Sequence, residues 1–170
     1  EYCVAIDVGT NGEIVLAGNN RILACSTAAG PAFEGAQIKF GMRAADGAIE
    51  EVFIDNEKGT CEVKVIGDKK AKGICGSGIL DAIAQLYRAG IIDFRGRFQG
   101  GEGQGENIHP ELKKRFVSTD AGFDFILTYP EESAAKGKAV VISQKDIGEL
   151  QLAKGAIYAG IKVLMAEMGI

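Results

Sequence analysis

The fold is decided by residues 2–16, which read Y-C-V-A-I-D-V-G-T-N-G-E-I-V-L. Apolar side chains occupy every second position before the Gly-Thr-Asn-Gly segment, at Val4, Ile6 and Val8. An apolar alternation of period two, followed by turn residues and a second apolar run, is typical of a β-hairpin. We expect Asn11 and Gly12 to form the turn, because both residue types tolerate the positive φ values that a tight hairpin requires.

The loop of this hairpin has the composition of a phosphate site. Gly9, Asn11 and Gly12 expose backbone N–H groups, Thr10 adds a hydroxyl, and such a loop can curl round a phosphate. Asp7, near the end of the first strand, can reach a magnesium ion through its water shell. Because Asn-Gly is also the commonest hairpin turn, a purely structural hairpin is the competing interpretation.

Residues 7–13, D-V-G-T-N-G-E, resemble the second phosphate-binding hairpin of the superfamily of acetate and sugar kinases, heat-shock chaperones and actin (ASKHA). In that superfamily Asp, Gly and Thr recur at this spacing. The resemblance implies an actin-like, ribonuclease-H-like fold with ATP and Mg²⁺ as ligands. It also implies that Asp7 is catalytic and positions hydrated magnesium, while residues 9–12 cradle phosphate.

Residues 25–35, C-S-T-A-A-G-P-A-F-E-G, interrupt the strand pattern and predict a loop with one short helical turn at the proline. With the hairpin before it and G-M-R-A-A after it, this run resembles the C-terminal part of reductive activators of corrinoid proteins. The resemblance extends over nearly the whole chain and is weakest over residues 94–138.

In that family a plant-type ferredoxin domain precedes an ASKHA ATPase, and the protein returns inactive Co(II) corrinoid to Co(I) during methyl transfer. The resemblance therefore implies a corrinoid protein as partner and an iron–sulfur cluster in an upstream domain. As a hypothesis, the hydroxyls of Ser26 and Thr27 contact that partner. A ferredoxin-like C-x₄-C-x₂-C pattern upstream in the full gene would favour this reading.

Residues 73–81, G-I-C-G-S-G-I-L-D, form a second informative stretch. Gly76 and Gly78 allow close backbone approach, Ser77 can cap, and apolar residues follow at helical spacing. Helix N-termini attract phosphate and ribose oxygens. The ASKHA resemblance places this turn, with Asp81 one helical turn later, near ribose or adenine, whereas packing alone is the competing interpretation. Neither a Rossmann fingerprint nor a P-loop is present in the sequence.

The rest of the chain predicts an α/β domain built on a twisted mixed sheet. Residues 4–26 are expected to form a three-stranded antiparallel meander, with a tight turn at residues 18–20. Further strands are expected at residues 48–55, 60–67, 115–119, 123–129 and 139–142. Two helices that pack against the sheet are expected at residues 77–89 and 143–168. Ser143 and Asp146 form a capping-box-like start for the last helix. Residues 94–114 carry too little apolar area to fold alone, and we expect a mobile glycine-rich loop.

Composition limits the possible functions. The chain has 170 residues, of which 46% are apolar and 25% charged, and this suits one domain. A net charge of −4 and a pI of about 5.1 argue against nucleic-acid and anionic-membrane binding. No apolar run approaches the ~20 residues of a membrane helix. Four cysteines without a C-x-x-C motif predict no metal site and favour a cytoplasmic location.

The sequence begins with Glu1 and enters a strand at once, so we expect a C-terminal ASKHA subdomain of a longer protein, the rest of which completes the nucleotide cleft. The favoured function is half of an ATPase that drives reductive activation of a corrinoid protein. Two alternatives stay open. One is a non-catalytic docking or dimerisation module, which allows a homodimer, and the other is half of an ASKHA small-molecule kinase, although no substrate base is evident.

Overall fold

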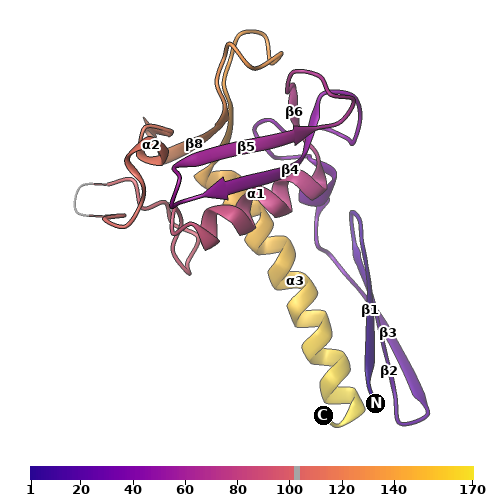
Figure 1. The fold of residues 1–170 in the computed structure, drawn as a ribbon. Helices are drawn as coiled ribbons and strands as arrows, with labels where there is room; N and C mark the ends of the chain where they lie inside the picture. The colour runs from indigo at the N-terminus through magenta and orange to yellow at the C-terminus, as the bar shows by residue number, and fades with distance from the viewer. Residues whose placement is uncertain (102–103) are drawn as a thin grey trace.

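The computed structural model describes residues 1–101 and 104–170, and it consists of a wide body and a narrow arm (Figure 1). The arm contains the antiparallel strands β1 (Cys3–Val8), β2 (Gly12–Gly18) and β3 (Arg21–Thr27), which lie beside helix α3 (Gln144–Met168). Both termini lie at the far end of the arm (Figure 1). The N-terminal end of α3 lies in the body, so this one helix joins the two parts.

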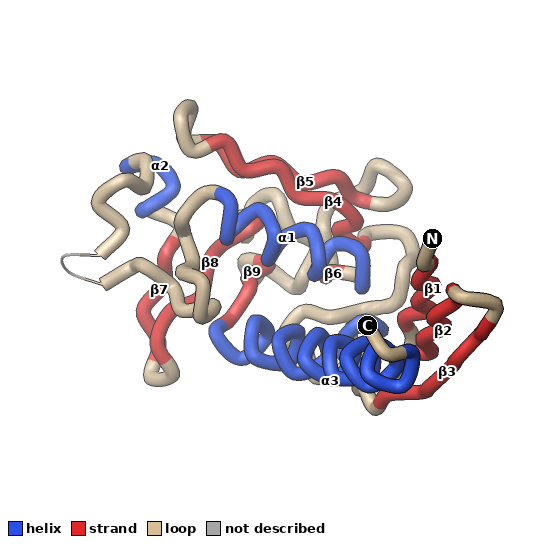
Figure 2. The backbone as a smooth tube through the Cα atoms, turned by 90° about the horizontal axis from the view of Figure 1, so that it is seen from below, coloured by secondary structure: helices blue, strands red, loops and turns tan. Residues whose placement is uncertain are grey.

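The body contains the remaining elements. In chain order they are η1 (Pro31–Glu34), β4 (Ala48–Asp55), β5 (Thr60–Val65), β6 (Gly73–Ile74), α1 (Gly76–Arg88), α2 (Pro110–Lys113), β7 (Phe116–Thr119), β8 (Gly122–Thr128) and β9 (Val140–Ser143). Helix α1 covers one face of the β4–β5 hairpin, and α3 starts directly after β9 (Figure 2). The α/β class and the antiparallel meander are therefore confirmed.

The sheet differs from the expected single mixed sheet. The described strands form three separate three-stranded sheets, in the orders β1-β2-β3, β5-β4-β6 and β7-β8-β9. Among the pairings between these strands, only that of β4 with β6 is parallel. The meander stays apart from the body because it has its own small core against the end of α3, made by Ile14, Leu16, Leu164 and Met168.

Of the two turns of the meander, one lies where the sequence pattern predicts it and the other does not. Asn19 and Asn20 have φ values of 48° and 56° and form the expected tight turn between β2 and β3. Asn11 and Gly12, by contrast, are not among the described residues with positive φ, and a three-residue loop at residues 9–11 joins β1 to β2. The predicted Asn-Gly turn is therefore wrong.

Close packing, and not turn geometry, explains why residue 12 is a glycine. It lies in β2, and a Cβ added there would come within 2.8 Å of Thr27 Oγ1 and 2.9 Å of Ile157 Cγ1. Gly160 of α3 is equally close to the meander, since an added Cβ would lie 2.5 Å from Thr27 Cγ2 and 2.7 Å from Ile14 Cδ1. These two glycines let α3 lie directly on β2 and β3.

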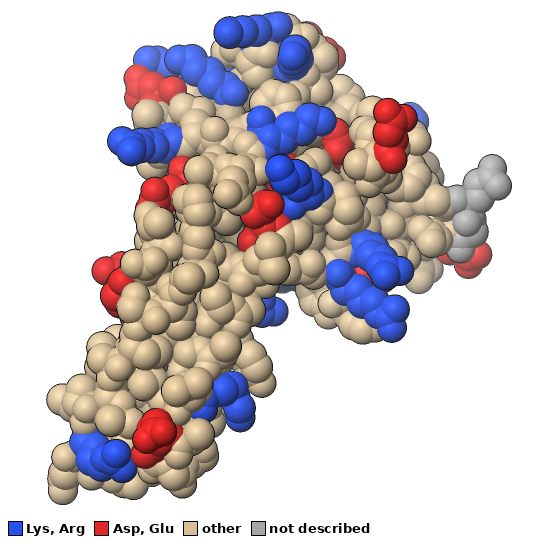
Figure 3. Space-filling model, turned by 180° about the vertical axis from the view of Figure 1, so that it is seen from behind, with Lys and Arg blue, Asp and Glu red and all other residues tan. Residues whose placement is uncertain are grey.

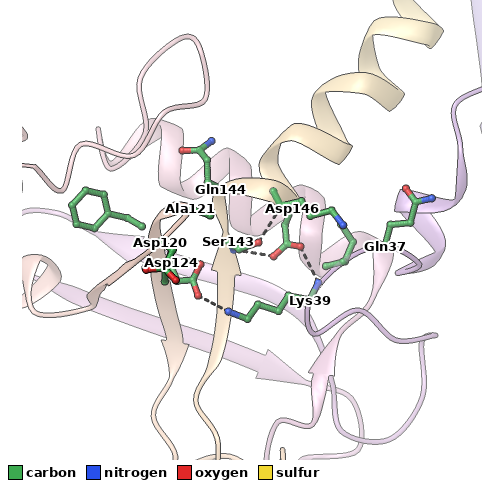
Figure 4. A pocket seen from close by; sticks show the side chains of 12 residues that line it. Gln37, Lys39, Asp120, Ala121, Asp124, Ser143, Gln144 and Asp146 are labelled. Atoms are coloured by element: carbon green, nitrogen blue, oxygen red, sulfur yellow. Dashed lines mark hydrogen bonds and ion pairs between the residues drawn. The ribbon is translucent and has the colours of Figure 1, made fainter.

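The N-terminus of α3 is held by the capping box that the sequence predicts. Ser143 Oγ accepts a hydrogen bond from the Asp146 N–H at 3.2 Å, and Asp146 accepts one from the Ser143 N–H at 2.8 Å. The second oxygen of Asp146, which is fully buried, accepts a hydrogen bond from the Lys39 N–H at 2.8 Å (Figure 4). The Lys39 ammonium pairs with buried Asp124 at 2.6 Å in the same pocket of about 470 Å³. This network ties the segment after η1 to α3 and β8.

The sequence predicts an exposed, mobile loop for the glycine-rich segment 94–114. Its residues 102 and 103 lie outside the described part of the chain, and its mobility stays a prediction. Among the described residues of the segment, Phe98, Ile108 and Leu112 are buried in the main core, because the chain folds back to the β4–β5 hairpin. There the His109 N–H donates to Asn56 Oδ1 at 2.9 Å.

The cysteines and the surface charges add no further candidate site among the described residues. All four cysteines are free, and burial raises the pKa of the Cys61 thiol to about 11. Within residues 1–101 and 104–170, no three His, Cys, Asp or Glu side chains are grouped to hold a metal ion, and no helix is long and apolar enough to cross a membrane. Charges of both signs are mixed over the body, while the arm is mostly neutral on the face in Figure 3.

Candidate functional site

The predicted phosphate loop and the predicted glycine turn come together beside one pocket. Residues 9–11, called the phosphate loop below, connect β1 to β2 at the end of the arm that is closest to the body (Figure 1). The Thr10 hydroxyl donates a hydrogen bond to the carboxylate of Glu34 in η1. Glu34 lines a pocket of about 460 Å³ together with residues 42–44 and the start of α1. Hereafter this space is called the Glu34 pocket.

The phosphate loop itself is largely open to solvent. A Cβ added at Gly9 would meet nothing closer than the Asn11 carbonyl oxygen at 3.9 Å, so this side of the loop is free for a ligand. The Gly9 N–H donates to that same carbonyl at 2.9 Å and is therefore occupied within the loop. Thr10 and Asn11 supply the backbone N–H groups that the loop can offer to an anion.

Asp7 lies in a row of polar side chains that crosses the meander. In the strand register Asp7 is opposite Glu13, and Glu13 is opposite Ser26, whose hydroxyl donates to the Glu13 carboxylate at 3.1 Å. Because side chains alternate along a strand and Ile14 faces α3, this row lies on the sheet face away from α3. Two neighbouring carboxylates suit a hydrated magnesium ion, which keeps most of its waters.

The sequence pattern did not place Glu13 opposite Asp7. A two-residue turn at Asn11 and Gly12 would have paired Asp7 with Leu16, whereas the three-residue loop pairs it with Glu13. Like charges directly opposite each other destabilise a sheet. The position of Glu13 opposite Asp7 could have been predicted only from the strand register. The incorrect turn at Asn11 and Gly12 gave a different register.

The glycine turn is explained by packing against protein atoms. A Cβ on Gly76 would lie 1.9 Å from the Phe33 carbonyl oxygen, and one on Gly78 would lie 2.1 Å from the Ile49 carbonyl oxygen. Both glycines therefore allow η1 and β4 to approach α1, as the competing interpretation of this stretch holds. The close approach that the sequence predicts is real, but the partner of each glycine is the protein backbone.

The other two residues of this turn also differ from expectation. Helix α1 begins at Gly76 with Cys75 as its N-cap, without a side-chain cap, so the prediction that Ser77 caps the helix is wrong. Ser77 lies inside the first turn, is exposed and lines the Glu34 pocket. Asp81 does not line this pocket, and its carboxylate instead accepts a hydrogen bond from the Val52 N–H at 2.6 Å. Its position is that of a structural link between α1 and β4.

Ser26 and Thr27, the predicted partner contacts, point to opposite faces of the meander. Ser26 is exposed in the row with Asp7 and Glu13. Thr27 donates its hydroxyl to the Gly12 carbonyl at 3.1 Å, and its methyl group packs near Gly160. Of the two, Ser26 is the more exposed, whereas Thr27 is half-buried and its hydroxyl is bonded within the chain.

The donors around the Glu34 pocket fit a phosphate-bearing ligand. The unpaired N–H groups at the start of α1 and the partial positive charge of the helix favour an anion. Arg43, which is exposed on the same pocket, can pair with phosphate oxygens. Asp7 and Glu13, beside the phosphate loop, add two carboxylates, the side-chain type that a hydrated magnesium ion prefers.

A family model described as the C-terminal domain of RACo, the ASKHA domain, matches residues 1–170. This chain belongs to that family. The assignment from residues 7–13 and 25–45 is thereby confirmed, as is the ASKHA class of the fold. The roles of individual site residues are not part of that match.

Two relatives match this chain over all or nearly all of its length. The corrinoid activation enzyme RamQ of Eubacterium limosum is 43% identical over 165 residues, which are 97% of this chain. The [Co(II) methylated amine-specific corrinoid protein] reductase of Methanosarcina barkeri is 30% identical over 192 aligned positions, covering 100% of this chain. The chain spans only 27% and 29% of the lengths of these two relatives.

A solved structure supports the same family. The reductive activator for a corrinoid, iron–sulfur protein superimposes with a TM-score of 0.85 at 40% sequence identity. The match covers 98% of this chain and 25% of that one. The fold of the arm and body together is therefore that of the matching quarter of this solved activator.

Proposed function

We propose that this chain is the nucleotide-binding ASKHA segment of an ATP-dependent activator that returns Co(II) corrinoid protein to Co(I) for methyl transfer. The single observation that carries the proposal is the family match over residues 1–170, together with relatives named for corrinoid activation or reduction. Electrons come from an iron–sulfur domain elsewhere in the protein. ATP supplies the free energy that drives this reduction.

In this proposal the polar row and the phosphate loop bind Mg-ATP. Asp7 binds hydrated magnesium through its waters, with Glu13 as the second carboxylate. Thr10 and Asn11 donate N–H groups to phosphate oxygens, and Arg43 supplies a positive charge at the pocket. Ser77, at the exposed start of α1, contacts the ribose side of the nucleotide. The rest of the protein provides the opposite wall of the cleft.

Ser26 is the proposed contact for the corrinoid partner. Its place beside Glu13 in the row would join the partner surface to the magnesium ligands, so that a change at the nucleotide reaches the partner directly. A docking module without nucleotide would not need two carboxylates opposite each other in a sheet. A small-molecule kinase is not favoured, since the relatives are named for corrinoid activation or reduction.

The proposal predicts that corrinoid reduction depends on ATP. The full-length gene product is mixed under anaerobic conditions with a corrinoid methyltransferase subunit in the Co(II) state and a low-potential one-electron reductant, and the Co(I) absorption is followed. We expect Co(I) to accumulate with Mg-ATP and not with a non-hydrolysable ATP analogue. Equal accumulation without nucleotide would show that this segment does not drive the reaction.

A further inference from the structure

We propose that Glu34 is a positioning residue of the nucleotide site, and that it holds the phosphate loop against the body through the hydroxyl of Thr10. The inference rests on the proposed function, because it assigns a role within the same site. Glu34 belongs to the string of residues 25–35 that carries the family resemblance, but the sequence pattern gives it no individual role. Its contact with Thr10 joins two segments that are separated by the whole of β2 and β3.

The backbone around Glu34 is fixed by packing. Ala32, two residues earlier in η1, is buried in the main core. The carbonyl of Phe33 occupies the space that a side chain on Gly76 would need. Gly35, with φ of 80°, comes so close to the backbone of Met42 that an added Cβ would lie 2.7 Å from the Met42 nitrogen. Packing on both sides therefore fixes where the Glu34 side chain starts.

The phosphate loop, in contrast, has few attachments. Its residues are exposed or half-buried, and its internal bond runs only from the Gly9 N–H to the Asn11 carbonyl. Within residues 1–101 and 104–170, the bond between Thr10 and Glu34 is the one side-chain hydrogen bond that joins this loop to another segment. Loss of that bond would leave the loop anchored only by strands β1 and β2.

The chemistry indicates that Glu34 acts as a hydrogen-bond acceptor and not as a phosphate ligand. A carboxylate placed directly against a triphosphate is repelled by it, whereas a carboxylate that accepts from Thr10 leaves the loop N–H groups facing the anion. An amide oxygen accepts the same hydrogen bond without a charge. Glutamine should therefore replace Glu34 in this role, and alanine should not.

The test measures Mg-ATP affinity calorimetrically with the full-length protein. Glu34→Ala and Thr10→Val should each raise Kd by roughly 2- to 10-fold, the range expected for one net hydrogen bond. The double variant should bind no more weakly than either single variant, because both remove the same bond. Glu34→Gln should recover most of the affinity. Glu57→Ala, which changes an exposed glutamate in the β4–β5 turn, should leave Kd unchanged.

Each other outcome overturns the inference. Wild-type affinity in Glu34→Ala would remove Glu34 from the site and leave the proposed function standing. Additive losses in the double variant would show that Glu34 and Thr10 act separately. An equal loss in Glu34→Gln and Glu34→Ala would mean that the charge is needed and not the acceptor. A wild-type protein that does not bind Mg-ATP would overturn the inference and the proposed function together.

Discussion

Asp7→Asn is expected to remove nearly all magnesium-dependent ATPase activity from the full-length protein while leaving its fold intact. A neutral amide binds the waters of a magnesium ion less well than a carboxylate does. Changes in the outer shell of a metal site typically cost roughly 10- to 100-fold in affinity or activity. We therefore expect a loss toward the upper end of that range, together with a higher magnesium concentration for half-maximal turnover.

The fold should tolerate this change because Asp7 is exposed and lies opposite Glu13, which carries the same charge. Removal of one of two facing charges should stabilise the hairpin by about 0.2–1 kcal/mol, if it changes stability at all. Asp120→Asn, an isosteric change at an exposed carboxylate after β7, is the matched control and should keep full activity. Unchanged turnover and magnesium dependence in Asp7→Asn would rule out Asp7 as a magnesium ligand.

Gly78→Ala is expected to destabilise the fold strongly. The added Cβ would lie 2.1 Å from the Ile49 carbonyl oxygen, and Ile49 belongs to β4, the central strand of its sheet, where it is fully buried. Neither backbone can move without breaking strand or helix hydrogen bonds. Overpacking of this kind costs about 1–3 kcal/mol or more, which exceeds the gain of about 1 kcal/mol from replacing glycine within a helix.

Gly155→Ala is the matched control, and it should change the stability of the protein in the opposite direction. Gly155 lies in the middle of α3, is exposed, and has no atom within 4 Å of an added Cβ. Alanine there should stabilise the protein by about 1 kcal/mol and raise its Tm by roughly 2–4 °C. Thermal unfolding followed by circular dichroism should thus move in opposite directions for the two variants. A Gly78→Ala protein with normal Tm but poor Mg-ATP binding would instead assign Gly78 to the nucleotide.

The sequence correctly predicted the elements that are determined by residues close together in the chain. The alternation in residues 2–16, the tight turn at Asn19 and Asn20, and the capping box at Ser143 and Asp146 all appear in the structure. Each is encoded within a few residues, by side-chain alternation, by tolerance of positive φ, or by a hydroxyl and a carboxylate three residues apart. The family assignment likewise came from short contiguous strings.

The remaining features depend on contacts between segments that are distant in the sequence. Gly12 lies under Ile157 of α3, and this contact makes it a strand residue and not a turn residue. Phe98, in a segment of low apolar content, is buried because other elements supply the core around it. The bond between Thr10 and Glu34 joins two loops whose approach no sequence pattern specifies. For these reasons, the arrangement of the candidate site residues could not be predicted from the sequence.

The most direct test of the central claim is a calorimetric titration of Mg-ATP into the full-length protein and into the 170-residue chain alone. If this chain carries about half of a nucleotide site that binds at ~1 μM, or roughly −8 kcal/mol, losing about 4 kcal/mol of contacts moves the affinity to about millimolar. We therefore expect micromolar binding by the full-length protein and about millimolar binding by the isolated chain. Absence of Mg-ATP binding by the full-length protein would contradict the account, and micromolar binding by the isolated chain would show that the site is already complete within these 170 residues.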